Sequence, residues 1–391
     1  MRKLQFDKSH ILLWLIAVLF LAALVVGIAV LRTESLSSQL RTDQPVNVLL
    51  IFQQDEKPIS TQLLTFYPSK AKAALLDVPG NTAVILTTIK RMDRIDYTFK
   101  ANSPKSFTTE VSRYLDIPLN GYLLFDEKDL SSFVDYLNGL QLFIPSMIIQ
   151  QGQKGVRLPG GAVTLDGDKV LQFLRYKEEQ ENEADALARR QKMALALIKR
   201  LAQNSAYLDN KKSASVLMKS IESNFSDQAL RRLLQEIAKL DADSVLMQRI
   251  TGTYRMVEGE EKFFPFYDGE LARDMLKQTL SAMSVANSSS SGGRIYTVEI
   301  LNGTTERGLA ARTAEIFGSF GYDVVAVGNA DKFEYASTRI IDRHGDKEAL
   351  ASIGAVIKCL NFGDASEYKG SIKADYTIIL GKDFNGRVCV Q

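Results

Sequence analysis

VNVLLIF at 46–52, LLTFY at 63–67 and AALLDV at 73–78 are three short apolar runs, and prolines and polar residues separate them. Runs of this length that are rich in aliphatic and aromatic side chains are typical of buried β-strands. This part of the chain therefore predicts the buried centre of a β-sheet.

Helices alternate with strands in the segment that follows. Helices are predicted at 104–115 and 127–137, and the hydroxyl group of Ser103 is expected to cap the first of them. Strands are predicted at 122–125 and 140–144. Because strands alternate with helices, the sequence predicts an α/β domain of three layers, with a sheet between two layers of helices.

The stretch LDGDKVLQFLRYKEEQENEADALARRQK at 165–192 combines an apolar helical face with a dense run of charges. Asp166 is predicted to cap a helix that carries Arg175, and Lys177 follows closely. A second amphipathic helix carries Arg190. Because an acidic run separates these cations, the stretch predicts either an anion-binding pocket or a solvent-exposed hinge of ion pairs.

The composition NSSSSGG at 287–293 is that of a flexible linker, and it marks a domain boundary. It separates a domain at 46–286 from a smaller α/β module at 294–391, in which short strands again alternate with a helix. Cys359 and Cys389 both belong to this module. The sequence leaves two states open for them, one disulfide bond or two buried free thiols.

The N-terminal part of the chain contains an apolar run at 11–31 without a single charge, which is long enough to cross a bilayer as one helix. Lysine and arginine side chains in the tail at 1–10 predict that the N-terminus stays in the cytoplasm. The segment at 32–45 is polar and is predicted to form a stalk. A cleaved signal peptide is the competing interpretation. We expect a single-pass protein of the cytoplasmic (inner) membrane with extracytoplasmic domains.

Composition excludes several classes of function. The net charge is +2, so no global field recruits nucleic acid. The chain has only two cysteines and two histidines, His10 and His344, and His10 adjoins the apolar run. These numbers exclude a zinc site with several cysteine ligands and a Ser/His/Asp triad. Acid–base chemistry must therefore come from carboxylates or water.

Several segments resemble the LytR-CpsA-Psr family. The family's strands, like NILLLGxD and TIMLLSINPKTKKVSLLSIPRDT, correspond to 47–54 and 62–82. Its segment LNGEQALAYARxR is similar to LDGDKVLQFLRYK at 165–177, and its closing RQ lies at 190–191. The stretch VEILNGTTERGLAARTAEIFGSFGYDVV at 298–325 resembles the LytR C-terminal domain. The resemblance implies a membrane-anchored transferase that moves glycopolymers from polyprenyl-pyrophosphate carriers to the cell wall.

Pyrophosphate chemistry needs guanidinium groups to bind the anion and carboxylates to hold a divalent cation. This chain departs from the family pattern at several such positions. Phe52 and Gln54 replace the Gly and Asp of the GxD turn, and ISTQ at 59–62 replaces RSDT. GN at 80–81 replaces the Arg-Asp of IPRD, and Leu187 stands where a late arginine is expected.

The remaining charges define a predicted residual phosphate or glycan site. It comprises Arg175, Lys177 in the place of an arginine, Arg190 and, in a charged turn, Arg94. Pairing of these cations with nearby carboxylates is the alternative interpretation. Asp55 lies one place from the expected carboxylate and is the candidate metal ligand.

We therefore expect an envelope protein that binds or scaffolds peptidoglycan, a glycopolymer or a polyprenyl lipid without turnover, and that needs no cofactor. The alternative is a divergent phosphotransferase that uses Mg²⁺ and attaches a glycopolymer to the wall. The chain has no basic recognition helix, so nucleic acid is not an expected partner.

Overall fold

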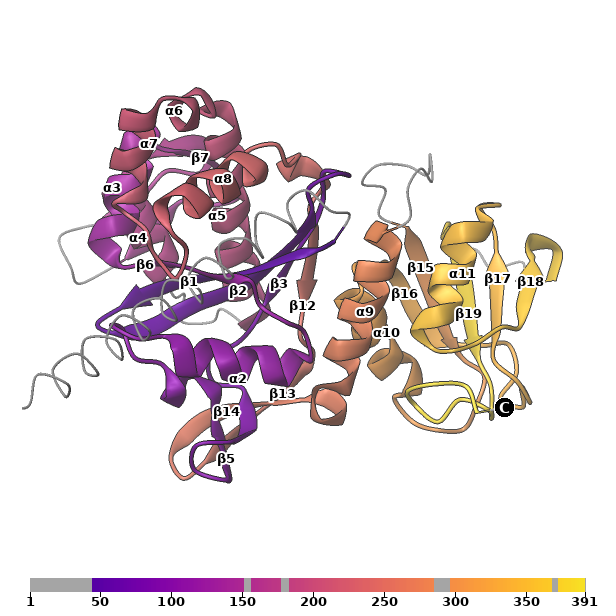
Figure 1. Cartoon of the computed structure of the whole chain (residues 1–391). Helices are drawn as coiled ribbons and strands as arrows, with labels where there is room; N and C mark the ends of the chain where they lie inside the picture. The colour runs from indigo at the N-terminus through magenta and orange to yellow at the C-terminus, as the bar shows by residue number, and fades with distance from the viewer. Residues whose placement is uncertain (1–43, 151–155, 177–182, 285–295, 368–371, 391) are drawn as a thin grey trace, which may run out of the picture.

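The computed structural model describes residues 44–150, 156–176, 183–284, 296–367 and 372–390. They form two α/β domains, each built around its own sheet (Figure 1). The predicted membrane anchor and the Ser/Gly linker lie outside the described residues. Within the described ranges, no helix is both long enough and apolar enough to cross a membrane.

The larger domain contains a mixed sheet of six strands in the order β11-β6-β1-β2-β3-β12. Its strands are β1 (Val46–Gln54), β2 (Lys57–Tyr67), β3 (Lys72–Asp77), β6 (Gly121–Phe125), β11 (Glu222–Ser223) and β12 (Leu246–Arg249). β2 runs antiparallel to both β1 and β3, whereas β1 runs parallel to β6. The three apolar runs of the sequence therefore form adjacent strands, as predicted.

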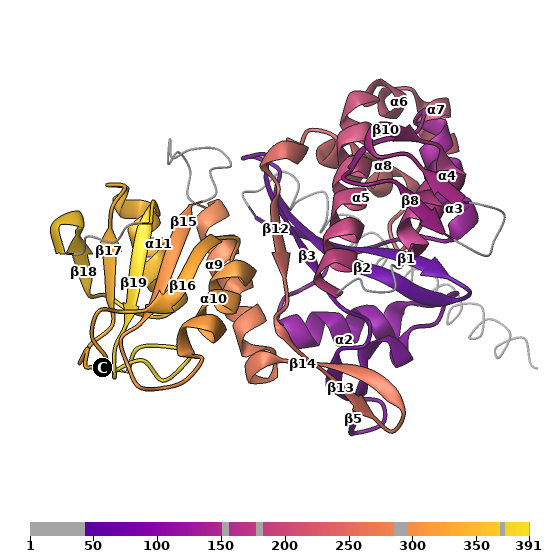
Figure 2. The same cartoon turned by 180° about the vertical axis from the view of Figure 1, so that it is seen from behind.

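Side chains of β1 alternate between two apolar cores, because successive residues of a strand point to opposite faces of the sheet. Val48, Leu50 and Phe52 pack in one core, and Leu49 and Ile51 pack in the other. Helices cover both faces of the sheet (Figures 1 and 2). One face carries α3 (Glu127–Tyr136), α4 (Gly167–Arg175), α5 (Glu183–Gln203) and α8 (Asp227–Ile237), and the other carries α2 (Lys105–Leu115) and α9 (Glu270–Ser284). The arrangement of three layers is confirmed.

Two local predictions about this domain differ in outcome. Asp166 caps α4 as predicted, because its carboxylate accepts a hydrogen bond from the backbone N–H of Lys169 at 3.0 Å. The predicted cap by Ser103 is wrong, since Pro104 occupies the N-cap position of α2 and no side chain caps the helix there. A proline fits the start of a helix without a donor of its own.

Strand β7 (Leu140–Ile144) was expected in the main sheet, but it pairs with β10 (Gly161–Leu165) in a separate two-stranded sheet. Further short elements complete this side of the domain. They are β8 (Ile148–Gln150), β9 (Val156–Leu158), α6 (Ala206–Asp209) and α7 (Lys211–Met218).

Two hairpins lie together below the sheet in Figure 1. One consists of β4 (Ala83–Leu86) and β5 (Arg91–Arg94), and the other of β13 (Gly252–Val257) and β14 (Glu260–Pro265). The backbone N–H of Phe263 donates to the carbonyl of Asn81 at 2.9 Å. A buried ion pair joins the hairpins, with 2.7 Å between Lys262 Nζ and Asp93 Oδ1. The hairpins therefore fix the segment that leaves the end of β3.

The C-terminal domain contains a five-stranded sheet in the order β16-β15-β19-β17-β18. Its strands are β15 (Thr297–Asn302), β16 (Asp323–Asn329), β17 (Arg339–Asp342), β18 (Phe362–Asp364) and β19 (Tyr376–Leu380). Helices α10 (Leu309–Ser319) and α11 (Lys347–Val356) pack with it around one core. The sequence predicted short strands that alternate with a helix in this domain, but it did not indicate α11 or β18.

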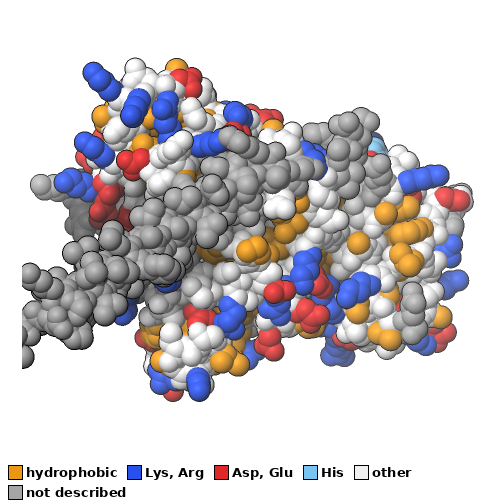
Figure 3. All heavy atoms as spheres, viewed as in Figure 1, with side chains coloured by type: hydrophobic (Ala, Val, Ile, Leu, Met, Phe, Trp, Pro, Cys, Tyr) orange, Lys and Arg blue, Asp and Glu red, His pale blue; other side chains and the backbone are white. Residues whose placement is uncertain are grey.

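Helix α9 joins the two domains. Its residues Met275 and Leu276 pack in the core of the larger domain, whereas Leu271 packs in the core of the C-terminal domain. Asp274 pairs with Arg387 of the C-terminal tail, with an N···O distance of 2.7 Å. Charged side chains gather beside α9 in the space-filling view (Figure 3). The domains therefore contact each other through a helix that belongs to both cores.

Candidate functional site

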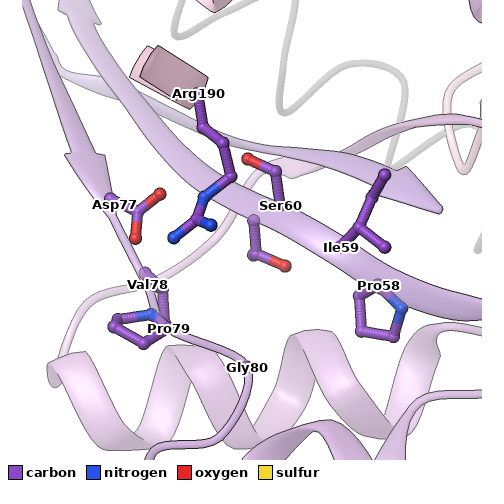
Figure 4. Close-up of a pocket in the computed structure, with 9 residues that line it drawn as sticks. Pro58, Ile59, Ser60, Asp77, Val78, Pro79, Gly80 and Arg190 are labelled. Carbon is purple, nitrogen blue, oxygen red and sulfur yellow. The ribbon is translucent and has the colours of Figure 1, made fainter. Parts of the chain in front are cut away.

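A small pocket lies where β2 begins, β3 ends and α5 passes (Figure 4). Its lining comes from three separate parts of the sequence: Pro58, Ile59, Ser60, Thr61, Asp77, Val78, Pro79, Gly80 and Arg190. All three parts contain positions at which the family resemblance placed functional residues. The fold therefore brings the segments 59–62, 80–81 and 190–191 to one place.

The pairing of β2 with β3 positions the carboxylate. Gln62 lies opposite Asp77 in the antiparallel register, and the backbone N–H of Val78 donates to the carbonyl of Thr61 at 2.9 Å. Asp77 is only 1% exposed. A buried carboxylate at the end of an apolar strand is unusual, because a charge loses its hydration there unless it interacts with a partner. The aspartate that ends the apolar run AALLDV is the sequence signal of this buried carboxylate.

Arg190 extends from α5 into the pocket, and its guanidinium group points toward the carboxylate of Asp77 (Figure 4). The pocket has a volume of about 20 Å³. A cavity of this size holds about one water molecule. The lining combines an anion-binding group, a carboxylate and two hydroxyl-bearing residues, Ser60 and Thr61, around one small space.

Gln191, the neighbour of Arg190, anchors α5 to the sheet. Its side-chain amide donates to the carbonyl of Gln248 on β12 at 2.6 Å and to the carbonyl of Leu75 on β3 at 3.2 Å. The side chain is buried, with 5% exposed. Because β3 also carries Asp77, these bonds fix Arg190 relative to the carboxylate that it faces.

Arg94 lies behind the wall of the pocket. Its guanidinium group donates to Asp96 at 3.0 and 2.6 Å, and the backbone N–H of Asp96 donates to the carbonyl of Gly80 at 3.0 Å. Burial raises the pKa of Asp96 above its usual value, although the hydrogen bonds from Arg94 act in the opposite direction. Arg94 therefore supports the loop at Gly80 and does not line the pocket.

The other predicted site residues lie elsewhere. Arg175 forms an ion pair with Glu127 at the start of α3 and does not line the pocket. Lys177 lies outside the described residues. Asp55 is exposed in the tight turn between β1 and β2, where its backbone φ is 47°. The described residues contain no group of three Asp, Glu, His or Cys side chains that could hold a metal ion.

At the positions where the family resemblance placed charged residues, the side chains are buried or line the pocket. Ile59 lines the pocket beside the hydroxyl-bearing residues, and Gln62 is fully buried and donates to Ser60 Oγ at 3.3 Å. Leu187 is also buried, with 5% exposed. Cys359 and Cys389 belong to the C-terminal domain and do not line the pocket. Among the sequence-predicted residues, the structure thus places Arg190 at the candidate site.

Comparisons with curated proteins give two relatives at low identity. The polyisoprenyl-teichoic acid–peptidoglycan teichoic acid transferase TagU of Bacillus cereus is 21% identical over 205 residues, which cover 51% of this chain and 67% of that protein. The protein of the same name from Enterococcus faecalis is 21% identical over 39% of this chain and 52% of its own length.

Two solved structures share the fold of the larger domain. Bacillus subtilis TagV has a TM-score of 0.55 at 19% identity and covers 61% of this chain and 98% of its own. TagT bound to LI-WTA has a TM-score of 0.52 at 21% identity and covers 62% of this chain and 92% of its own. At such identities the likeness is one of fold.

The models of two families match successive parts of the chain. The model described as the LytR_cpsA_psr family matches residues 31–279. The model described as the LytR cell envelope-related transcriptional attenuator matches residues 295–384. Because the first match spans more than half of the chain, this chain belongs to the LytR_cpsA_psr family and carries a C-terminal domain of the LytR type.

Proposed function

We propose that this chain is a divergent phosphotransferase of the LytR-CpsA-Psr type, which moves an envelope glycopolymer from a polyprenyl-pyrophosphate carrier to the cell wall. The main support is the convergence of Arg190, the buried Asp77 and Ser60 in the lining of one pocket. The curated relatives are named as teichoic acid transferases, which favours transfer over binding alone. The apolar run at 11–31 would anchor this pocket at the membrane that contains a polyprenyl carrier.

Arg190 is the proposed pyrophosphate-binding group. A guanidinium group offers parallel N–H donors that match the oxygens of a phosphate. A pocket of about 20 Å³ has no room for pyrophosphate beside the present side-chain positions. We therefore expect the substrate to draw the long Arg190 side chain away from Asp77 and to widen the pocket.

Asp77 is the proposed general base. The hydroxyl group of the wall acceptor attacks the phosphorus that bears the glycopolymer, and its proton passes to the carboxylate of Asp77. A new P–O bond forms to the acceptor, and the bond from this phosphorus to the bridging oxygen breaks. Polyprenyl monophosphate leaves with the electron pair of that bond.

A divalent cation fits this pocket only if the substrate supplies most of its ligands. Asp77 is the single carboxylate among the described residues of the lining, and Mg²⁺ is commonly bound by one or two carboxylates together with substrate phosphates. Such an ion would neutralise negative charge on the transferred phosphoryl group. Ser60 and Thr61 would then orient the remaining phosphate oxygens.

Binding without turnover is the second candidate function, and the lining of the pocket favours it. Among the described residues that line the pocket, Arg190 is the only cation, and Ile59 and Gly80 occupy positions where charges were expected. One guanidinium group can bind a phosphate, but it neutralises little of the charge that develops during transfer.

The two candidates separate in one experiment with the full-length chain in mild detergent. The substrate is a polyprenyl-pyrophosphate-linked oligosaccharide with Mg²⁺ and a peptidoglycan acceptor, and both its binding and the release of polyprenyl phosphate are measured. Arg190→Gln should lower the rate of release about 10- to 100-fold, because a charge-assisted hydrogen bond contributes roughly 1.5–3 kcal/mol. Arg175→Gln is the matched control, since Glu127 already pairs with this arginine, and it should change the rate less than about twofold.

Asp77→Asn should also lower release while it leaves binding within about tenfold, because a general base contributes to the chemical step. Binding without any release by the wild-type chain would favour the second candidate function. A wild-type chain that neither binds nor turns over this substrate would refute both.

A further inference from the structure

The two cysteines of the chain lie side by side in the C-terminal domain. Cys359 follows α11 and is 2% exposed, whereas Cys389 is half-buried in the C-terminal tail and packs against the same core. The backbone N–H of Cys389 donates to the carbonyl of Ile357 at 2.8 Å, and Cys389 also forms an antiparallel bridge with Phe384. Both are free thiols in the structure, and the Sγ atom of Cys359 donates to the carbonyl of Thr338 at 3.5 Å.

The tail that carries Cys389 also holds the two domains together. Arg387 donates to Asp274 on α9 at 2.7 Å and to the carbonyl of Val356 on α11 at 3.0 Å. The hydroxyl group of Tyr267 donates to the carbonyl of Gly386 at 3.0 Å. The tail therefore bridges α11 and the joint at which the larger domain leads into α9.

The joint itself has an unusual backbone. Tyr267, Asp268 and Gly269 all have positive φ angles, of 52°, 49° and 81°. Two successive non-glycine residues in the left-handed region cost free energy, so surrounding contacts must hold them there. The bond from Tyr267 to Gly386 is such a contact, and it depends on the position of the tail.

We propose that Cys359 and Cys389 form a disulfide bond that fastens the C-terminal tail to its domain and thereby preserves the contact of Arg387 with α9. The bond would close a loop of about thirty residues, and closing such a loop restricts the unfolded tail more than the folded one. Because the proposal concerns the C-terminal domain, it does not depend on the proposed phosphotransferase activity.

The oxidation needs a disulfide donor, either a small-molecule disulfide or a protein disulfide. The thiolate of half-buried Cys389 attacks the donor, forms a mixed disulfide and releases one thiol of the donor. The thiolate of Cys359 then attacks the sulfur of Cys389, the protein disulfide forms, and the second donor thiol leaves. Two protein thiols are oxidised, and one donor disulfide is reduced to two thiols.

The test compares the full-length chain after treatment with oxidised glutathione and after treatment with a phosphine reductant. Mass spectrometry of a non-reducing digest should find the peptides of Cys359 and Cys389 linked in the oxidised sample, with no free thiol in the folded chain. Hydrogen exchange in residues 384–390 should be at least about tenfold slower in the oxidised chain than in the reduced chain.

Two variants complete the design. Cys389→Ser should remove the effect of oxidation on exchange in the tail. Arg387→Ala should leave the disulfide intact and speed exchange in α9. Two free thiols in the oxidised, folded wild-type chain would overturn the proposal, as would a glutathione adduct at Cys389 that never resolves. Equal hydrogen-exchange rates of the tail in the oxidised and reduced chains would also overturn it, because the disulfide bond would then not restrict the tail.

Discussion

Replacing Gln191 with methionine should destabilise the larger domain by about 2–3 kcal/mol. The amide of Gln191 donates to two buried carbonyl groups, at 2.6 Å to Gln248 and at 3.2 Å to Leu75. Methionine has a similar length but no donor, so both carbonyl groups lose a partner. Each net hydrogen bond contributes roughly 1 kcal/mol, and an unsatisfied buried acceptor adds to the loss.

The matched control is Gln203→Met, on the same helix at an exposed position. Gln203 accepts one hydrogen bond, from Arg200 at 3.0 Å. A surface substitution of this kind should change the free energy of unfolding by less than about 0.5 kcal/mol. The two variants thus carry the same chemical change in buried and exposed surroundings.

Hydrogen exchange of peptides from α5, β3 and β12 measures the effect, because local opening of these elements is read directly. In Gln191→Met the protected amides should exchange roughly 30- to 150-fold faster, which corresponds to the expected 2–3 kcal/mol. Substrate binding should weaken as well, since Arg190 loses its fixed position. An exchange rate within about threefold of the Gln203→Met variant would refute the reasoning, because the two bonds would then contribute nothing.

Three further predictions concern the supports of the pocket. Lys262→Met should lower the free energy of thermal unfolding by about 1.5–3 kcal/mol, because Asp93 loses its 2.7 Å partner and keeps the more exposed Arg91 as an ion-pair partner. A loss under about 0.5 kcal/mol would contradict this. Burial alone would raise the pKa of Asp93, but hydrogen bonds, above all from Lys262, lower it below its ordinary 3.8. The stabilisation should therefore persist above about pH 4 and disappear as the pH falls through the lowered pKa, so that the wild-type chain and Lys262→Met converge in acid urea denaturation. The double variant Gly80→Arg, Asn81→Asp should tighten pyrophosphate binding at least about tenfold in calorimetry, because a second guanidinium group would face the ligand. It should slightly lower the melting temperature, because a Cβ at position 80 would lie 3.0 Å from the carboxylate of Asp96. An unchanged affinity would show that position 80 does not face the ligand.

Local patterns in the sequence determined most of the secondary structure. The three apolar runs became β1, β2 and β3, and Asp166 capped α4, because apolar periodicity and capping act within a few residues. Where such signals were weak, the prediction failed. Helix α11 and the charged hairpin of β4 and β5 were not recognised, since their stability comes from packing against distant elements.

The candidate site was likewise predicted only in part. The resemblance identified Arg190 and the segments 59–62 and 80–81, and the fold placed parts of all three in one lining. It did not indicate Asp77, which the apolar pattern assigned to a strand. The resemblance grouped Arg175 with Arg190, and the charged turn suggested Arg94, although each of these two pairs with a carboxylate outside the pocket.

Local patterns and composition thus predicted most of the core strands and helices, the two α/β domains and the family. Only the packing of distant segments brings Asp77 in front of Arg190, places residues of α9 in two cores and sets Cys389 beside the segment of Cys359. The physical reason is the range of the interactions. Capping and periodicity depend on neighbours along the chain, whereas a pocket depends on the pairing register of β2 with β3 and on the packing of α5, which bring distant residues into contact.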